Sequence, residues 1–163
     1  MNINAIWHPT ITYGQYRNWD GGPVPAPGPL FYEGVDSFTA DLLSSMSDEV
    51  LLVKEWIMQQ YPSLDLFGIR HVRDWMTRAY GEDIGNRSSL LSMLHTNKGY
   101  IGLRHPVSRV NDHTDSLVMP NFQYRYMTED LPCGLVVIRG IAELAGVNVP
   151  HIDQVIEIGR AHV

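Results

Sequence analysis

The chain has 163 residues, a length that predicts one domain able to bury a hydrophobic core of its own. Its 44% hydrophobic and 18% charged residues are ordinary for a globular protein and exclude a disordered chain. The formal net charge of -6 argues against a nucleic-acid partner, because such proteins carry basic surfaces. No apolar run approaches the roughly 18 residues of a membrane-spanning helix, and the single cysteine excludes an internal disulfide. We therefore expect a cytoplasmic protein with no membrane partner.

Residues 1–35 are expected to form a loop-rich N-terminal segment. They contain five prolines and five glycines, and four of the prolines alternate with other residues between Pro23 and Pro29. Proline lacks a backbone donor and favours extended structure. A helical body is expected to follow over 36–163.

The next segment changes to a helical period. Apolar residues recur every three or four positions over 36–61, a pattern typical of an amphipathic helix. Asp36 or Ser37 has the side chain of a helix N-cap. Tyr61 followed by Pro62 is expected to end the helix.

Two further helices are expected in the middle of the chain, over 63–80 and 87–95. Gly81 directly follows the first of them and suits a helix C-terminus. Residues 96–124 show no clear periodicity and no convincing pair of strands. A long irregular segment in a small domain is often functional.

The final third of the chain again has helical features. Thr128 is expected to cap a helix whose first turn is acidic and contains proline, and Gly146 is expected to end it. Pro150 then opens a last helix. Together these elements predict an all-α, multi-helix domain.

Three polar residues are candidates for chemistry. His8 is either a loop histidine or a general acid/base, because imidazole titrates near neutral pH. Asp130 is either a first-turn acid that favours the helix dipole or a carboxylate that orients an imidazolium. Arg125 is either an exposed charge or a planar fork that binds a substrate carboxylate.

A metal site and a nucleotide site are both disfavoured by spacing. No histidine pair has the i, i+4 spacing of H-E-x-x-H, and no C-x-x-C occurs. Neither G-x-G-x-x-G nor G-x-x-x-x-G-K-[ST] occurs either, so we expect no metal-binding and no cofactor-binding residues in this chain. A metal-dependent enzyme would have to use scattered loop residues, namely His95, His105, Asp112, His113 and Asp115.

Two stretches of the sequence resemble one known family. The segment RYMTEDLPCGLVVIRGIAELAGVNVPHID at 125–153 and the opening NINAIWHP, followed by FYEG at 31–34, are similar to the C-terminal helical domain of opine dehydrogenases, the octopine and nopaline dehydrogenase family. The resemblance implies one helical substrate and catalytic domain over 1–163. It also implies a fold like the C-terminal domain of 6-phosphogluconate dehydrogenase-like enzymes.

The resemblance also implies roles and partners. His8 matches the family's catalytic histidine, Asp130 the aspartate that pairs with it and raises its pKa, and Arg125 the arginine that binds the keto-acid carboxylate. In that family an N-terminal Rossmann domain binds NAD or NADP, and an amino acid condenses reductively with a 2-keto acid. This chain lacks that domain and is expected to bind no cofactor alone.

Two functions remain open at this stage. The chain is either the catalytic and substrate-binding half of an opine dehydrogenase, inactive without a Rossmann domain in cis or in trans, or a truncated, non-catalytic helical module for binding or dimerisation. A truncated domain would expose apolar surface, and a homodimer could cover it. Whether the chain by itself is an enzyme is left undecided by the sequence.

Overall fold

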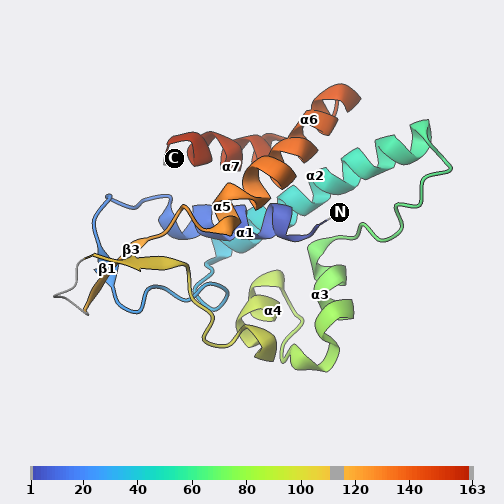
Figure 1. Ribbon diagram of the computed structural model, residues 1–163. Coiled ribbons are helices and arrows are strands. Elements are labelled where there is room, and N and C mark those ends of the chain that lie inside the picture. Colours follow the sequence, from blue (N-terminus) through green and yellow to red (C-terminus); the bar gives the residue numbers. More distant parts are fainter. Residues whose placement is uncertain (1, 111–115, 162–163) are drawn as a thin grey trace.

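The computed structural model describes residues 2–110 and 116–161 and is mainly helical (Figure 1). The helices are α1 Asn4–Tyr16, α2 Ser37–Gln60, α3 Val72–Tyr80, α4 Leu90–Thr96, α5 Arg125–Thr128, α6 Val136–Ala145 and α7 Pro150–Ala161. Short 3₁₀ turns η1 and η2 cover Gly81–Asp83 and Lys98–Tyr100, and a π-helical turn, η3, covers Leu131–Leu135. Three short strands complete the fold: β1 Val24–Pro25, β2 Val107–Arg109 and β3 Leu117–Pro120.

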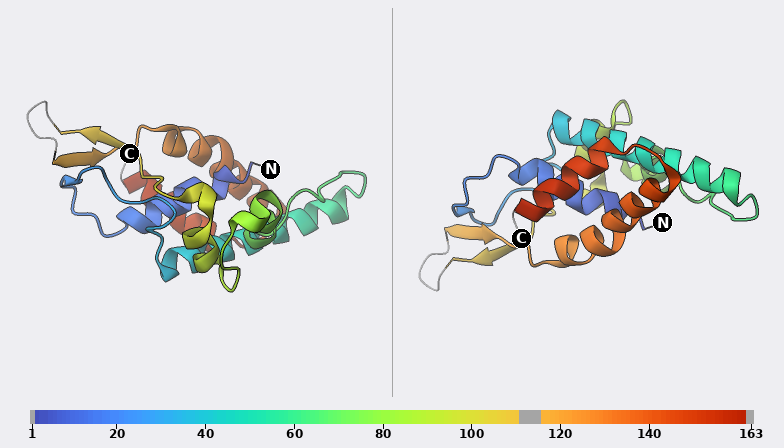
Figure 2. Two further views of the ribbon diagram at one scale, coloured as in Figure 1. Left: turned by 90° about the horizontal axis from the view of Figure 1, so that it is seen from below. Right: turned by 90° about the horizontal axis from the view of Figure 1, so that it is seen from above.

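Helix α1 lies in the middle of the molecule and packs against α2, α5, η3 and α7 (Figures 1 and 2). The prediction of a loop over 1–35 is therefore wrong for its first half, and only the part after Tyr16 is irregular apart from β1. Nearly every residue from Ala5 to Thr12 is buried, on all sides of the helix. A helix buried all round shows no amphipathic period. Pro9 inside it further disguised the helix in the sequence.

The helix predicted over 36–61 is confirmed as α2. Asp36 is its N-cap and accepts a hydrogen bond from the backbone N–H of Thr39 at 2.9 Å. The prediction over 63–80 is wrong at its start, because α3 begins only at Val72. Residues 63–70 are largely exposed, and Phe67 keeps 68% of its surface in solvent. They have too little buried surface to offset the cost of ordering a helix.

A small antiparallel sheet lies at one end of the molecule, with strand order β1-β3-β2 (Figure 1). Val24 pairs with Val118, and Ser108 pairs with Met119. The expectation of no strand pair is thus wrong. Strands of two to four residues are too short to show a period-2 pattern in the sequence. The all-α prediction holds for the body of the domain.

The C-terminal helices differ in detail from the prediction. Thr128 ends the short helix α5 and caps nothing, and α6 starts only after the π-helical turn η3. Gly146 does end α6, in the left-handed conformation that favours glycine (φ 66°). Pro150 opens α7 as predicted.

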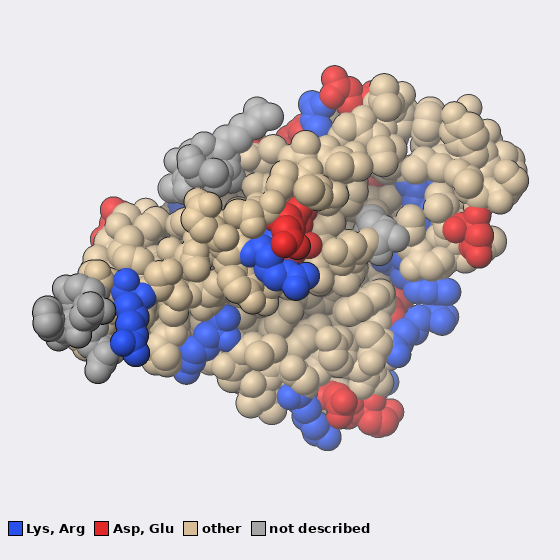
Figure 3. All heavy atoms as spheres, viewed as in Figure 1, with Lys and Arg blue, Asp and Glu red and all other residues tan. Residues whose placement is uncertain are grey.

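Charged side chains are scattered over the surface. On the face shown in Figure 3, basic and acidic residues alternate without forming a large patch of one sign. In the described part of the chain, no helix is both long and apolar enough to cross a bilayer.

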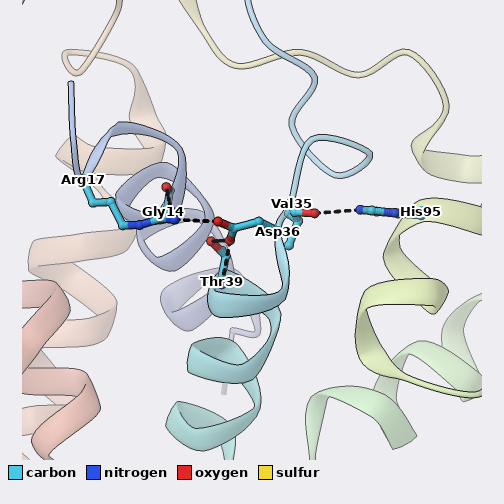
Figure 4. A network of polar contacts seen from close by, with 6 residues as sticks. All are labelled: Gly14, Arg17, Val35, Asp36, Thr39 and His95. Carbon is cyan, nitrogen blue, oxygen red and sulfur yellow. Dashed lines mark hydrogen bonds and ion pairs between the residues drawn. The ribbon is translucent and has the colours of Figure 1, made fainter. Parts of the chain in front are cut away.

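A polar network joins the end of α1 to the start of α2 (Figure 4). Arg17 donates to the carbonyl of Gly14 and, at 2.6 Å, to Asp36 Oδ2. Gly14 is required here, because a Cβ at this position would lie 2.0 Å from Thr39 Oγ1. The ring of His95 on α4 donates to the Val35 carbonyl at 2.7 Å, which ties α4 to the same corner.

Candidate active site

The structure brings His8 and Asp130 together although 122 positions separate them. His8 Nδ1 lies 2.8 Å from Asp130 Oδ2, and the two side chains are only 8% and 7% exposed. His8 comes from the middle of α1, and Asp130 from the junction between α5 and η3. The long separation is closed because α1 packs directly against η3.

The carboxylate of Asp130 pairs with the histidine and does not cap a helix. Asp130 occupies the N-cap position of η3 but has helical dihedral angles and makes no capping hydrogen bond. Its Oδ1 instead accepts a long hydrogen bond from Asn2 Nδ2 at 3.4 Å. The interpretation of Asp130 as an acid that only serves a helix start therefore does not describe this geometry.

A glycine sets the separation between the two helices that carry the pair. A Cβ at Gly134 in η3 would lie 2.6 Å from the Cβ of Ala5 in α1, closer than real Cβ contacts allow. The small residues let η3 approach α1 one turn away from His8. Single π-helical turns such as η3 are often found at functional sites.

Aromatic rings enclose the imidazole. The Tyr126 ring stacks on His8 with centroids 3.7 Å apart and planes inclined by 22°. Phe31 meets His8 edge-on at 5.7 Å. Phe31 comes from the FYEG segment, and Tyr126 lies between Arg125 and Asp130 in the sequence. In the sequence, the only signal for Tyr126 is its position between the candidate residues Arg125 and Asp130.

Burial controls the protonation of His8. It lowers the pKa of His8 below 6.5, and the nearby positive charge of Arg125 lowers that pKa further. The hydrogen bond and the negative charge of Asp130 raise the same pKa but do not outweigh burial. Asp130 thus raises the pKa of His8 as expected, but burial outweighs this contribution, so the pKa is lowered overall and the neutral form of His8 predominates at pH 7.

The hydrogen bond also selects the tautomer of that neutral ring. A carboxylate only accepts hydrogen bonds, so Nδ1 carries the proton and Nε2 carries the lone pair. Nε2 bonds to no described residue, and it is not among the fully buried polar atoms without a partner. It is thus available as a base.

Arg125 lies near this pair but does not touch it. Its side chain is 59% exposed, and its ion-pair partner is Glu129, with Nε 3.9 Å from the carboxylate. Basic and acidic side chains lie side by side near the centre of the face in Figure 3, where Figure 1 places α5. The guanidinium therefore remains available to an anion arriving from solvent.

The histidines considered for a metal site have other environments. His95 anchors Val35, and His105 is buried against the rings of Phe31 and Tyr16. Asp112, His113 and Asp115 lie outside the described residues. Within the described ranges, no group of three potential ligands is close enough to hold a metal ion.

The described residues do not fit a nicotinamide dinucleotide by themselves. The sheet that they form is antiparallel, whereas dinucleotides bind at the carboxyl ends of parallel strands. The sequence also lacks the glycine-rich loop that receives the pyrophosphate.

The fold and the pair together define an α-helical domain that carries a buried histidine–aspartate dyad. The family model described as the alpha-helical domain of NAD/NADP octopine/nopaline dehydrogenase matches residues 1–163. The chain belongs to this family, of which it represents the helical domain.

Named relatives agree with this assignment. The chain is 43% identical over 157 residues to tauropine dehydrogenase from Arabella iricolor and 44% identical over 161 residues to octopine dehydrogenase from Mizuhopecten yessoensis. These matches cover 96% of this chain but only 38% and 39% of the two relatives. The chain thus spans less than half of their length.

Solved structures give the same result. Octopine dehydrogenase with NADH and L-arginine superimposes with a TM-score of 0.85 at 40% identity, over 97% of this chain and 38% of that one. Octopine dehydrogenase with NADH and pyruvate gives a TM-score of 0.78 at 37% identity, over 97% and 36%. The helical fold is therefore that of octopine dehydrogenase.

Proposed function

We propose that this chain is the substrate-binding and acid–base half of an opine dehydrogenase, which condenses an amino acid with a 2-keto acid. The observation that carries the proposal is the buried contact of 2.8 Å between His8 Nδ1 and Asp130 Oδ2. It leaves the basic nitrogen of a neutral imidazole free. The relatives crystallised with NADH and either L-arginine or pyruvate support the substrate classes.

The proposed role of His8 is to carry two protons, one after the other, from the amino group to the carbonyl oxygen. Its Nε2 takes a proton from the amino group, so that the nitrogen lone pair can attack the keto carbon. The imidazolium gives this proton to the former carbonyl oxygen, and Nε2 then carries a second proton from the same nitrogen to that oxygen, which leaves as water while the nitrogen lone pair closes the C=N bond of the protonated imine. Asp130 stabilises the transient imidazolium and keeps the ring oriented. The lowered pKa of His8 suits this sequence, because the ring starts as a base.

Arg125 is proposed to bind the keto-acid carboxylate. Its guanidinium is exposed and offers two parallel N–H donors to a carboxylate, with only a distant ion pair to Glu129 to give up. A fixed carboxylate would orient the keto carbon toward the amine. The subsequent reduction requires hydride from NADH or NADPH held by a second, nucleotide-binding domain.

The proposal is tested by restoring that domain. The chain is combined with an opine dehydrogenase Rossmann domain, fused or in trans, and NADH oxidation is followed with pyruvate and a series of amino acids. We expect turnover that His8→Asn abolishes. The matched control is His151→Asn, which removes another carboxylate-paired imidazole and should retain activity. Folded domains that give no turnover with any amino acid would contradict the proposal.

The second candidate is a non-catalytic module that self-associates. It is favoured by an apolar hollow of about 310 Å³ between α1, α2 and α6, lined by residues such as Val53, Ile57, Val137 and Ile141. A second copy of the chain could cover this hollow. A strictly monomeric mass in solution would count against this candidate.

A further inference from the structure

The ring of Tyr126 makes the closest aromatic contact of the imidazole of His8. Its centroid lies 3.7 Å from that of His8, and the two planes are inclined by only 22°. Phe31 contacts the same imidazole at a larger distance and at a steep angle of 72°. Tyr126 therefore covers a flat face of the histidine, while Phe31 meets the ring edge-on.

A single hydrogen bond does not fix the plane of a histidine ring. The bond from Nδ1 to Asp130 holds one edge of the imidazole but tolerates some rotation about the Cβ–Cγ bond, because a hydrogen bond accepts a range of angles. A stacked ring opposes this rotation, because tilting the imidazole would drive it into the aromatic face. The hydrogen bond and the stack thus constrain different motions of the same side chain.

Tyr126 is itself held from two sides. Its ring packs against Phe31 at 5.3 Å and against Tyr124 at 4.9 Å. Among the described residues, nothing forms a hydrogen bond with its hydroxyl group. The contact with the histidine is consequently made by the ring and not by the hydroxyl.

The chain connects this ring to both other members of the proposed site. Tyr126 directly follows Arg125 and precedes Asp130 by four residues, within α5 and the turn after it. One short segment therefore provides a cation, a stacking ring and a carboxylate on the same side of α1.

We propose that Tyr126 is a positioning residue, whose ring fixes the plane of the His8 imidazole and keeps water from one of its faces. This inference rests on the function proposed above. In this proposal two partners orient Nε2: the Asp130 carboxylate, which bonds to Nδ1, and the Tyr126 ring, which stacks on the face of the imidazole. It also explains in part why His8 is buried enough for its pKa to be lowered.

The test uses three substitutions that separate the properties of the tyrosine. Tyr126→Phe keeps the flat ring, Tyr126→Leu keeps apolar cover without a flat face, and Tyr126→Ala removes both. The pKa of His8 is measured by NMR on the 163-residue chain, and kcat and KM on the chain combined with a Rossmann domain. Tyr61→Ala, at an exposed tyrosine after α2, is the matched control. Thermal unfolding is measured for every variant to verify that it is folded.

We expect Tyr126→Phe to remain within about twofold of the wild type in kcat and to keep the lowered pKa of His8. Tyr126→Leu should lower kcat about tenfold, with little change in the KM of the keto acid, because the base is less well oriented. Tyr126→Ala should lower kcat further and shift the pKa of His8 upward, toward or beyond 6.5.

Two results would overturn the inference. If Tyr126→Phe loses as much activity as Tyr126→Ala, the hydroxyl and not the ring is important. If folded Tyr126→Leu and Tyr126→Ala keep both the kcat and the His8 pKa of the wild type, the stack has no positioning role. Failure of the proposed function is distinct, since it appears as an inactive wild type, and the NMR titration of His8 still tests the stack.

Discussion

Two buried carboxylates of this domain each bind a histidine, with different consequences. Asp130 Oδ2 lies 2.8 Å from His8 Nδ1, and Glu49 Oε1 lies 2.7 Å from His151 Nδ1. The carboxylates are equally buried, at 7% exposure each. The histidines are not: the side chain of His8 is 8% exposed, and that of His151 is 44% exposed.

The backbone around each carboxylate explains the difference. Glu49 on α2 also accepts hydrogen bonds from the backbone N–H groups of His151 at 2.9 Å and Ile152 at 3.0 Å, at the start of α7. It therefore satisfies the free donors of a helix terminus from a neighbouring helix. Within the described ranges, Asp130 accepts a hydrogen bond from no backbone N–H group, and its second partner is Asn2.

The comparison shows that a histidine–carboxylate pair does not by itself indicate catalysis. What distinguishes the pair at His8, within the described part of the chain, is an enclosed imidazole and a carboxylate that accepts no backbone hydrogen bond. The pair at His151 is expected to stabilise the fold, and the pair at His8 to act in the reaction. Four measurements test this division.

The largest effect is expected at Asp130. Asp130→Asn is isosteric but has no charge to stabilise an imidazolium, so kcat of the two-domain enzyme should fall about 10³-fold. The free energy of unfolding should change by only about 1 kcal/mol. Steady-state kinetics and urea unfolding give the two values. A variant within tenfold of the wild type would remove the distinction between the two pairs.

Glu49 should show the opposite behaviour. Glu49→Ala leaves two backbone donors and an imidazole without their acceptor, so the free energy of unfolding should fall by about 2–4 kcal/mol. Activity per folded molecule should be retained. Glu55→Ala, at an exposed position of the same helix, is the control. Lost activity at unchanged stability would place Glu49 in the reaction and contradict the comparison.

A third histidine extends the comparison, because His105 is buried and neither of its ring nitrogens has a hydrogen-bond partner among the described residues. Burial lowers the pKa of His105 to about 3. In the unfolded chain His105 has a pKa near 6.5, so it is protonated at a higher pH than in the folded chain. The contribution of His105 to the free energy of unfolding is therefore fully present above pH 6.5 and is lost as the pH falls toward 3. The loss should be about 2 kcal/mol at pH 5.

Urea unfolding at pH 7.5 and pH 5 measures this loss. His105→Phe keeps an aromatic ring but cannot be protonated, so it should lessen the difference between the two pH values. An unchanged difference in His105→Phe would show that other groups cause the acid sensitivity. His8, whose pKa is also lowered by burial, contributes with the same sign.

The smallest effect is expected at Arg125. Arg125→Lys keeps the charge but loses the fork of parallel donors, so the KM of the keto acid should rise about tenfold, or about 1.4 kcal/mol. The pKa of His8 should change little, because the positive charge remains. Arg78→Lys, at an exposed position of α3, is the control. An unchanged KM would mean that Arg125 does not bind the carboxylate.

Much of the helical body followed from local signals in the sequence. The period of α2, its cap at Asp36 and the glycine at 146 are all properties of neighbouring residues, and the structure agrees with them. Helix α1 has no such signal, since it is buried on every side and contains Pro9. The strands were missed because each has only two to four residues, and because β1 pairs with a strand about 90 positions away, as Val24 does with Val118.

The candidate site likewise combines features that local sequence signals predict with features that depend on long-range packing. Imidazole and carboxylate chemistry can be expected from His8 and Asp130 individually, and the family resemblance joined them. Their contact depends on the packing of α1 against η3, which Ala5 and Gly134 permit. The stack of Tyr126 on His8 depends on the same packing and has no local signature.

The central position of α1 also has a consequence for synthesis on the ribosome. Helix α1 is synthesised before the helices that cover it, and its neighbour α7 begins at Pro150, more than 130 residues after Tyr16. At about 5–20 residues per second, synthesis of α7 begins roughly 7–27 s after α1 is complete. We predict that nascent chains stalled before α7 are cleaved by protease within α1, whereas complete chains resist. Equal resistance would mean that α1 finds cover earlier.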